Sequence, residues 1–233
     1  MIQLDNITKH YGDCVALDQI NLHLEYGNVY GLWGRNGAGK TTLIRIVLGV
    51  LSPDHGEVKV FGADPKKDWS VRRELGITTD EDVYFPELTV EEFLWWVGKL
   101  RSVKENIYQE QVERYTRAFY IDEHRNHFIG SLSHGTRRKV SVISAFIGAP
   151  KLIVMDEPLN GLDVDSIEAL YHSLKKHHQN GGAVLIACHD AAFIKEVCTE
   201  ITEIDKGKII RQDHAEKMDI GFSIKKVNKT DNE

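Results

Sequence analysis

The sequence of 233 residues lacks the features that mark several classes of protein. Its three cysteines, Cys14, Cys188 and Cys198, have neither Cys-x-x-Cys nor metal-ligand spacing, so we expect free thiols in a reducing compartment and no structural metal. No apolar run approaches the roughly 20 residues that span a bilayer, and the first residues lack the pattern of a secretion signal. These absences predict a cytoplasmic protein, any membrane connection of which must come through another chain.

An excess of positive charge is also missing. The 29 lysines and arginines are outnumbered by 35 aspartates and glutamates, which gives a formal net charge of −6. No basic cluster interleaves with aromatic residues, so the sequence argues against a nucleic-acid partner. The length and the 42% hydrophobic content suffice for one large α/β domain, or for a core with a subdomain.

The most informative segment that is present is GRNGAGKTT at residues 34–42, which fills the positions of a phosphate-binding loop. An apolar strand pattern precedes it and an apolar helix face follows it. The glycines let backbone N–H groups point at phosphate oxygens, while Lys40 neutralises the β and γ phosphates and Thr41 offers a hydroxyl to Mg²⁺. An ordinary glycine turn would not need the GKT ending, so we predict binding of a nucleoside triphosphate. The residues expected to bind it here are Gly34, Asn36, Gly37, Ala38, Gly39, Lys40, Thr41 and Thr42.

A second constellation of polar residues follows the apolar segment 152–155, which ends in Asp156, Glu157 and Pro158. We expect Asp156, at the end of a buried strand, to hold Mg²⁺ through water. The adjacent Glu157 is expected to face the other side of the strand, where a water could attack the γ-phosphate. A solvated Asp-Glu turn is the alternative interpretation, and the presence of a phosphate loop disfavours it.

The patterns along the chain predict a mixed α/β fold. Apolar and polar residues alternate over residues 20–24, which predicts antiparallel strands near the N-terminus. Short apolar runs at 152–155, 183–187 and 201–204 are separated by helical segments and predict a largely parallel sheet. Residues 205–208 have the composition of a hairpin turn at its edge.

A mainly helical block interrupts these α/β segments. Thr89 to Glu92 has the capping-box arrangement ahead of an apolar run, so a helix should start there. Another helix is predicted over residues 140–147, preceded at 136–139 by what we interpret as a solvated helix face without a catalytic role. The predicted division is a single domain of residues 1–221, with α/β parts 1–86 and 150–221, a helical insert 87–149 and a polar tail 222–233.

The segment SLSHGTRRK at residues 131–139 resembles the signature motif of ATP-binding cassette (ABC) proteins, whose common form is LSGGQ. The order of the other motifs agrees over nearly the whole chain. Tyr11 matches the family's aromatic residue that stacks on adenine, residues 160–163 resemble its D-loop, and His189 matches its switch histidine. In isolation, Tyr11 is as well explained as a surface aromatic, His189 as a strand-end histidine and Asp163 as a helix cap.

The resemblance implies a RecA-like α/β P-loop NTPase core with an antiparallel β subdomain and an inserted helical subdomain. It also implies that two cassettes, either two copies of this chain or this chain and a paralogue, close head to tail on two molecules of ATP with Mg²⁺. Each nucleotide would lie between the phosphate loop of one chain and Ser133 and Gly135 of the other, with Asp163 nearby. Glu157 would then orient or deprotonate the water, and His189 would hold the γ-phosphate.

Two parts of the sequence depart from the family pattern. Asp80 stands where the family usually carries the Q-loop glutamine, with Glu81 as the neighbouring alternative. Because an ionised aspartate only accepts hydrogen bonds and adds negative charge beside phosphates, we expect Asp80 to lie close to the metal. His134 and Thr136 replace residues of the signature motif, and we expect His134 to point away from the nucleotide.

The resemblance therefore leads us to expect the ATPase subunit of an ABC transporter whose membrane-spanning subunits are separate chains, and these partner subunits would hold it at the inner face of the membrane. Export is the preferred direction, because no added regulatory domain follows the core. The aromatic residues Phe93, Trp95 and Trp96 either face such a subunit or pack in the helix core. A soluble cassette ATPase acting in assembly or in nucleic-acid or ribosome work remains the alternative. A P-loop kinase or GTPase would leave the signature motif and His189 unexplained.

Overall fold

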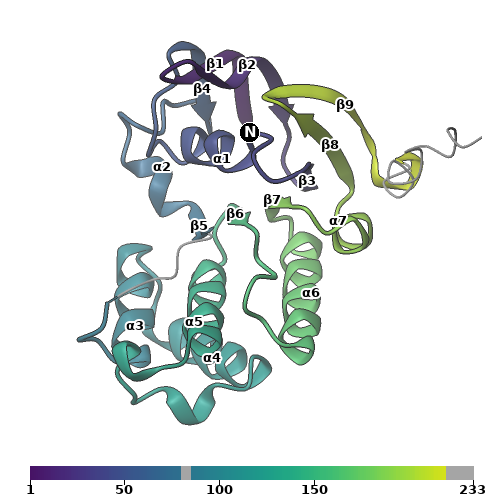
Figure 1. Ribbon diagram of the computed structural model, residues 1–233. Helices are drawn as coiled ribbons and strands as arrows, with labels where there is room; N and C mark the ends of the chain where they lie inside the picture. The colour runs from purple at the N-terminus through teal and green to yellow at the C-terminus, as the bar shows by residue number, and fades with distance from the viewer. Residues whose placement is uncertain (80–84, 219–233) are drawn as a thin grey trace, which may run out of the picture.

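The computed structural model describes residues 1–79 and 85–218. Its centre is a six-stranded sheet whose first five strands are parallel and whose last strand is an antiparallel edge (Figure 1). In spatial order the strands are β5 (Leu75–Thr78), β6 (Leu152–Asp156), β7 (Ala183–Cys188), β3 (Val29–Trp33), β8 (Glu200–Asp205) and β9 (Lys208–His214). Every residue of β6 and β7 is buried, in agreement with sequences that are apolar except for Asp156 at the end of β6. The predicted parallel sheet and its hairpin turn at residues 205–208 are confirmed.

A smaller antiparallel sheet lies above the central sheet in Figure 1. Its strands, in spatial order, are β2 (Cys14–Leu24), β1 (Ile2–Tyr11) and β4 (His55–Val60). The alternating residues Ile20, Leu22 and Leu24 are buried and share one hydrophobic core with helix α1 (Lys40–Val47). The predicted antiparallel strands are thus confirmed, and α1 packs against strands of both sheets.

Helices α3 (Val90–Leu100), α4 (Glu105–Ala118) and α5 (His134–Phe146) form the lower part of the molecule in Figure 1. The capping box at the start of α3 is confirmed, because the Thr89 hydroxyl accepts from the backbone N–H of Glu92 at 3.2 Å and the Glu92 carboxylate accepts from the N–H of Thr89 at 2.8 Å. Helix α5 begins at residue 134, earlier than the predicted 140, because the Ser133 hydroxyl caps it by accepting from the N–H of Thr136 at 3.1 Å.

Helices α6 (Val164–Gln179) and α7 (Ala191–Val197) pack against strands of the central sheet, and the short helix α2 (Ser70–Arg73) precedes β5. The fold class predicted from the sequence is therefore confirmed, while the domain boundaries at residues 86–87 and 149–150 stay a proposal. Within the described ranges, every helix is too short or too polar to cross a lipid bilayer.

Candidate nucleotide-binding site

The phosphate loop joins the end of β3 to the start of α1, at the carboxyl edge of the central sheet. Gly37 and Gly39 have φ angles of 79° and 110°, in a region that residues with a side chain rarely adopt. A Cβ atom at Gly34 would lie 2.2 Å from the backbone oxygen of Ile204, so the loop also needs glycine there to approach β8. The three glycines thus hold the loop in a curve in front of the N-terminus of α1, where backbone N–H groups favour an anion.

The Lys40 side chain lies inside this curve and is only 5% exposed. Its ammonium donates to the backbone oxygens of Gly34 at 2.8 Å and Arg35 at 3.3 Å. The same nitrogen lies 3.2 Å from a carboxylate oxygen of Glu157. The Lys40 ammonium is therefore held between the loop and the carboxylate of Glu157, the residue that follows β6.

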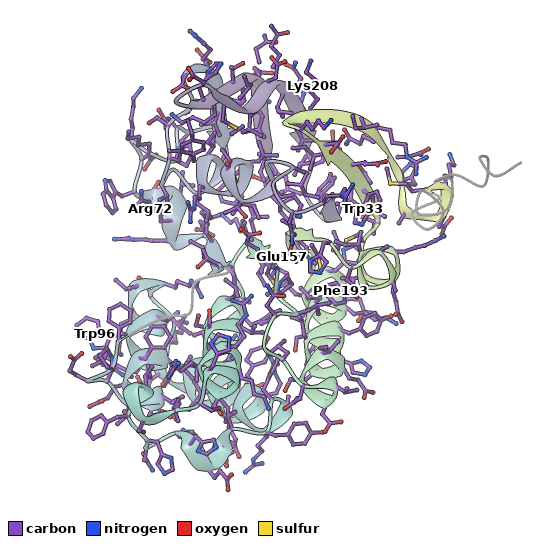
Figure 2. The ribbon with its side chains drawn as sticks, viewed as in Figure 1. Trp33, Arg72, Trp96, Glu157, Phe193 and Lys208 are labelled. Atoms are coloured by element: carbon purple, nitrogen blue, oxygen red, sulfur yellow. The ribbon has the colours of Figure 1, made fainter. Side chains whose placement is uncertain are left out.

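The two carboxylates occupy different environments. Asp156 ends β6 and is 1% exposed. Glu157 has a left-handed backbone with φ 47°, and its N–H donates to the backbone oxygen of Ala187 at 2.8 Å. The Glu157 carboxylate also accepts from Nδ1 of His189 at 2.7 Å. In Figure 2, Glu157 lies between the sheet part and the helical part of the molecule.

A pocket of about 520 Å³ brings most of the predicted residues together. It is lined by residues 36–42 of the loop together with Tyr11, Glu157, Asn160 and His189. Tyr11 is 49% exposed at the end of β1, with the Lys9 ammonium 6.0 Å from the centroid of its ring, so an exposed part of the ring can stack on a planar base. Cys14, Val15 and Ala16 also line the pocket and were missed by the sequence analysis. Alternation over residues 20–24 predicted a strand, and β2 begins earlier, at Cys14. The contact of its first residues with the phosphate loop is a tertiary feature without a local signal.

The signature segment and the D-loop lie together. Asn160 of the D-loop lines this pocket, whereas Ser133 and Gly135 of the signature segment do not. Gly161 has a φ of 77°, and a Cβ atom there would meet the His134 ring at 3.2 Å, so His134 packs on the D-loop. Asp163 is a helix cap that accepts from the N–H of Ser166 at 2.9 Å, and it pairs with Lys139 at 2.7 Å. The hydrogen bond from Lys139, followed by that from Ser166, lowers the pKa of Asp163 to about 2.

One expectation about the signature helix was wrong. Arg138 belongs to the segment that we interpreted as a solvated face, yet it is only 1% exposed. Because α5 starts at His134 rather than at residue 140, Arg138 lies in its second turn and points into the protein, where backbone oxygens accept from its guanidinium. Asp80, predicted near the metal, lies outside the described residues.

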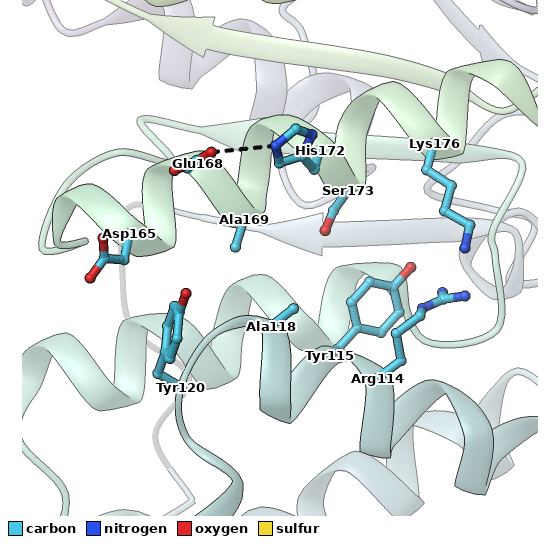
Figure 3. A pocket seen from close by; sticks show the side chains of 10 residues that line it. All are labelled: Arg114, Tyr115, Ala118, Tyr120, Asp165, Glu168, Ala169, His172, Ser173 and Lys176. Carbon is cyan, nitrogen blue, oxygen red and sulfur yellow. Dashed lines mark ion pairs between the residues drawn. The ribbon is translucent and has the colours of Figure 1, made fainter.

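A second pocket, of about 370 Å³, lies between α4 and α6 (Figure 3). It carries charges of both signs, including Glu168, which lies 3.6 Å from His172 on the same helix. None of the predicted site residues lines it. The pocket beside the phosphate loop is therefore the one that collects the residues with nucleotide chemistry.

The comparisons with known proteins agree with this geometry. A family model described as ABC transporter matches residues 17–160. The Nod factor export ATP-binding protein I of Cupriavidus metallidurans is 30% identical over 91% of this chain and 70% of its own length.

Two solved structures share the fold. The structure of an ATP-binding subunit of an ABC transporter has a TM-score of 0.87 and 25% identity, over 92% of this chain and 90% of that one. A dimeric post-hydrolysis ATP-binding cassette bound to ADP and Pi has a TM-score of 0.82 and 22% identity, over 92% of this chain and 99% of that one, and this likeness concerns the fold alone.

Proposed function

Because the chain belongs to the ABC transporter family and is an ATPase of that family, we propose that it is the subunit that powers a transporter whose membrane-spanning parts are separate chains. The observation that carries this proposal is the contact of Lys40, Glu157 and His189 beside the glycine loop. A cation, a carboxylate and an imidazole there face the place where the γ-phosphate of a bound triphosphate would lie.

The proposed chemistry uses each group in a different role. Lys40 attracts the phosphate oxygens. Nδ1 of His189 donates to the Glu157 carboxylate and keeps it in place, and Nε2 donates to the γ-phosphate when the ring carries a proton on both nitrogens. That carboxylate orients the attacking water and accepts its proton. Its partly buried position, 12% exposed, limits the access of bulk water.

The donors near the loop also fit Mg²⁺. Thr41 supplies a hydroxyl oxygen and Asp156 a buried carboxylate, and oxygen donors of this kind are those that Mg²⁺ prefers. We propose that these two residues hold the ion, directly or through water. When bound, Mg²⁺ supplies positive charge that neutralises the phosphate oxygens.

We further propose that two cassettes close head to tail on ATP. The resemblance assigns Ser133 and Gly135 to the γ-phosphate, and neither residue lines the pocket of its own chain. Together these two points support a site that is completed by a second chain. The neighbour of the same fold with ADP and Pi is itself dimeric. Triphosphate then bridges two chains, and loss of the γ-phosphate releases them.

A groove of about 550 Å³ between α2 and α3 is the proposed contact with the membrane-spanning partner. Its lining includes Trp69, which is 70% exposed, and Leu100, which is 67% exposed. Trp96, which lies on α3 like Leu100, is 53% exposed, whereas Phe93 of α3 is 7% exposed and packs in the core. Of the three aromatic residues considered from the sequence, Trp95 and Trp96 are thus exposed and available to a partner, and Phe93 is not. We propose export as the direction of transport, with support only from the name of the Nod factor relative.

The role of Glu157 is tested by Glu157→Gln. This variant should keep MgATP binding, lose at least about 100-fold of turnover because a general base is removed, and elute as a dimer with ATP. Glu168→Gln is the matched control, because that carboxylate is 72% exposed on α6, away from the phosphate loop. A Glu157→Gln protein that stays monomeric with ATP and retains full ATPase activity overturns the assignment.

The partner is tested by affinity purification of tagged Glu157→Gln protein from detergent-solubilised cells with ATP. The groove is supported as the contact site if the Glu157→Gln protein captures a polytopic membrane protein. Adding Leu100→Glu should then abolish this capture, and adding Ile107→Glu should leave it unchanged. Ile107 is a suitable control because it is an exposed apolar residue on α4. Reproducible capture of water-soluble partners alone favours instead a cassette ATPase that acts in assembly or in ribosome work.

A further inference from the structure

Arg138 is the largest side chain among those that are fully buried in the described part of the chain. One guanidinium nitrogen donates to the backbone oxygen of Thr79, just beyond β5. The other donates to the backbone oxygens of Glu157 at 2.7 Å and Asp156 at 3.2 Å, at the end of β6. A single side chain from the signature helix thus joins the ends of two neighbouring strands and the residue that carries the proposed catalytic carboxylate.

The backbone of Glu157 needs such support. Its φ of 47° is disfavoured for a residue with a Cβ atom. The following residue is Pro158, whose ring normally forces the preceding residue into an extended conformation. Both local effects would therefore move Glu157 out of its observed conformation, so tertiary contacts must hold it there.

Those contacts act on both sides of the residue. The N–H of Glu157 donates to Ala187 of β7, while its carbonyl oxygen accepts from Arg138 and, at 3.2 Å, from the N–H of Asn160. The bond from the guanidinium is charge-assisted and therefore stronger than the two neutral ones. Since the direction of the Cα–Cβ bond follows from φ and ψ, fixing this peptide also aims the carboxylate at Lys40 and His189.

We propose that Arg138 is a positioning residue for ATP hydrolysis, which holds Glu157 in its left-handed conformation and so sets the place of the carboxylate beside the γ-phosphate. The inference depends on the proposed role of Glu157. The same helix also contacts the D-loop through the His134 ring and the pair of Lys139 with Asp163. Arg138 is the member of this set that bonds to Glu157 itself.

The chain offers a matched control in Arg101. Its guanidinium donates to the backbone oxygens of Leu75 at 2.8 Å, Ser144 at 2.8 Å and Ile147 at 2.6 Å. The three oxygens that Arg101 binds lie at the start of β5 and at the end of α5. Arg138 instead lies near the start of α5 and binds an oxygen just beyond the end of β5. Replacing either arginine by methionine removes three carbonyl contacts, so a purely structural role predicts the same outcome for both.

The test compares Arg138→Met, Arg138→Lys and Arg101→Met in the full chain, below the melting temperature of each. Arg138→Met should lower kcat about 100-fold with KM and the Kd for a fluorescent ATP analogue nearly unchanged, because a displaced catalytic group costs about that factor. Arg138→Lys should recover part of kcat, since an ammonium can still donate to the Glu157 carbonyl. Arg101→Met should lower the melting temperature without this loss of kcat.

The double variant Arg138→Met/Glu157→Gln identifies the route of the effect. If Arg138 acts through Glu157, the double variant is no slower than Glu157→Gln alone. Equal kcat losses in Arg138→Met and Arg101→Met, or an unchanged kcat in Arg138→Met, overturn the inference while leaving the role of Glu157 intact. Full activity of Glu157→Gln overturns the proposed function instead. If Arg138→Met does not fold, the kcat values of Arg138→Lys and Arg101→Lys are compared instead. A larger loss of kcat in Arg138→Lys supports the inference, and equal losses overturn it.

Discussion

The stability of the fold should depend on pH through His177. This residue of α6 is 8% exposed and packs edge-on against Phe146 with ring centroids 6.4 Å apart. Burial lowers the pKa of His177 from 6.5 to about 4, because the charged ring loses its hydration. Between these two values the unfolded chain binds a proton that the folded chain does not bind. The free energy of unfolding therefore falls as the pH is lowered from 6.5 to 4. Above pH 6.5 His177 causes no such loss.

The magnitude follows from the size of the pKa shift. Each pKa unit corresponds to about 1.4 kcal/mol, so the loss is at most about 3 kcal/mol at pH 4 and about 2 kcal/mol at pH 5. The assay is urea unfolding between pH 7.5 and 4.5 for the parent chain and for His177→Leu, which removes the proton site and keeps an apolar side chain. The variant should lose about 2 kcal/mol less than the parent between pH 7.5 and 5.

His172→Leu is the control for that experiment, because His172 is 68% exposed on the same helix (Figure 3). Its pH dependence should follow that of the parent chain. Identical pH dependence of the parent chain and His177→Leu would refute the burial of a neutral ring at this position.

Two shorter predictions concern the site and its support. Tyr11→Ala should weaken ATP binding about tenfold, because base stacking is lost. Tyr26→Ala is the control and should not weaken it, since Tyr26 is also exposed but does not line the pocket. Equal Kd values for the two variants in a fluorescence titration would contradict the role of Tyr11. Gly76→Ala should lower the free energy of unfolding by about 1–3 kcal/mol, because its Cβ would lie 2.0 Å from the Ala145 oxygen of α5. Urea denaturation with an unchanged midpoint would argue against this close approach.

The features predicted correctly from the sequence have local causes. The capping box needs only Thr89 and Glu92, three residues apart, and the antiparallel strands follow from alternation over a few residues. The phosphate loop is equally local, because its glycines, lysine and threonine act within one turn. In each case the chain neighbours supply most of the contacts that fix the structure.

The features that the sequence did not predict depend on distant residues. The start of β2 lines the nucleotide pocket because Ala16 lies against Gly39 and Gly207. The left-handed conformation of Glu157 runs against the preference that Pro158 imposes, so the local sequence predicts the opposite. A pattern read along the chain cannot include contacts that only the sheet creates.

Arg138 illustrates the same limit for charged residues. A helical pattern counts an arginine as polar and assigns it to the solvated face, which is the usual position of this residue type. Its burial depends on carbonyl oxygens 59, 18 and 19 residues away in sequence, and these converge only when β5 and β6 pair. Because an unpaired buried charge is costly, the strands and the arginine must come together in folding, or Arg138 would turn outward. The burial of a charge between the signature helix and Glu157 therefore connects the assembly of the fold to the geometry of the proposed catalytic group.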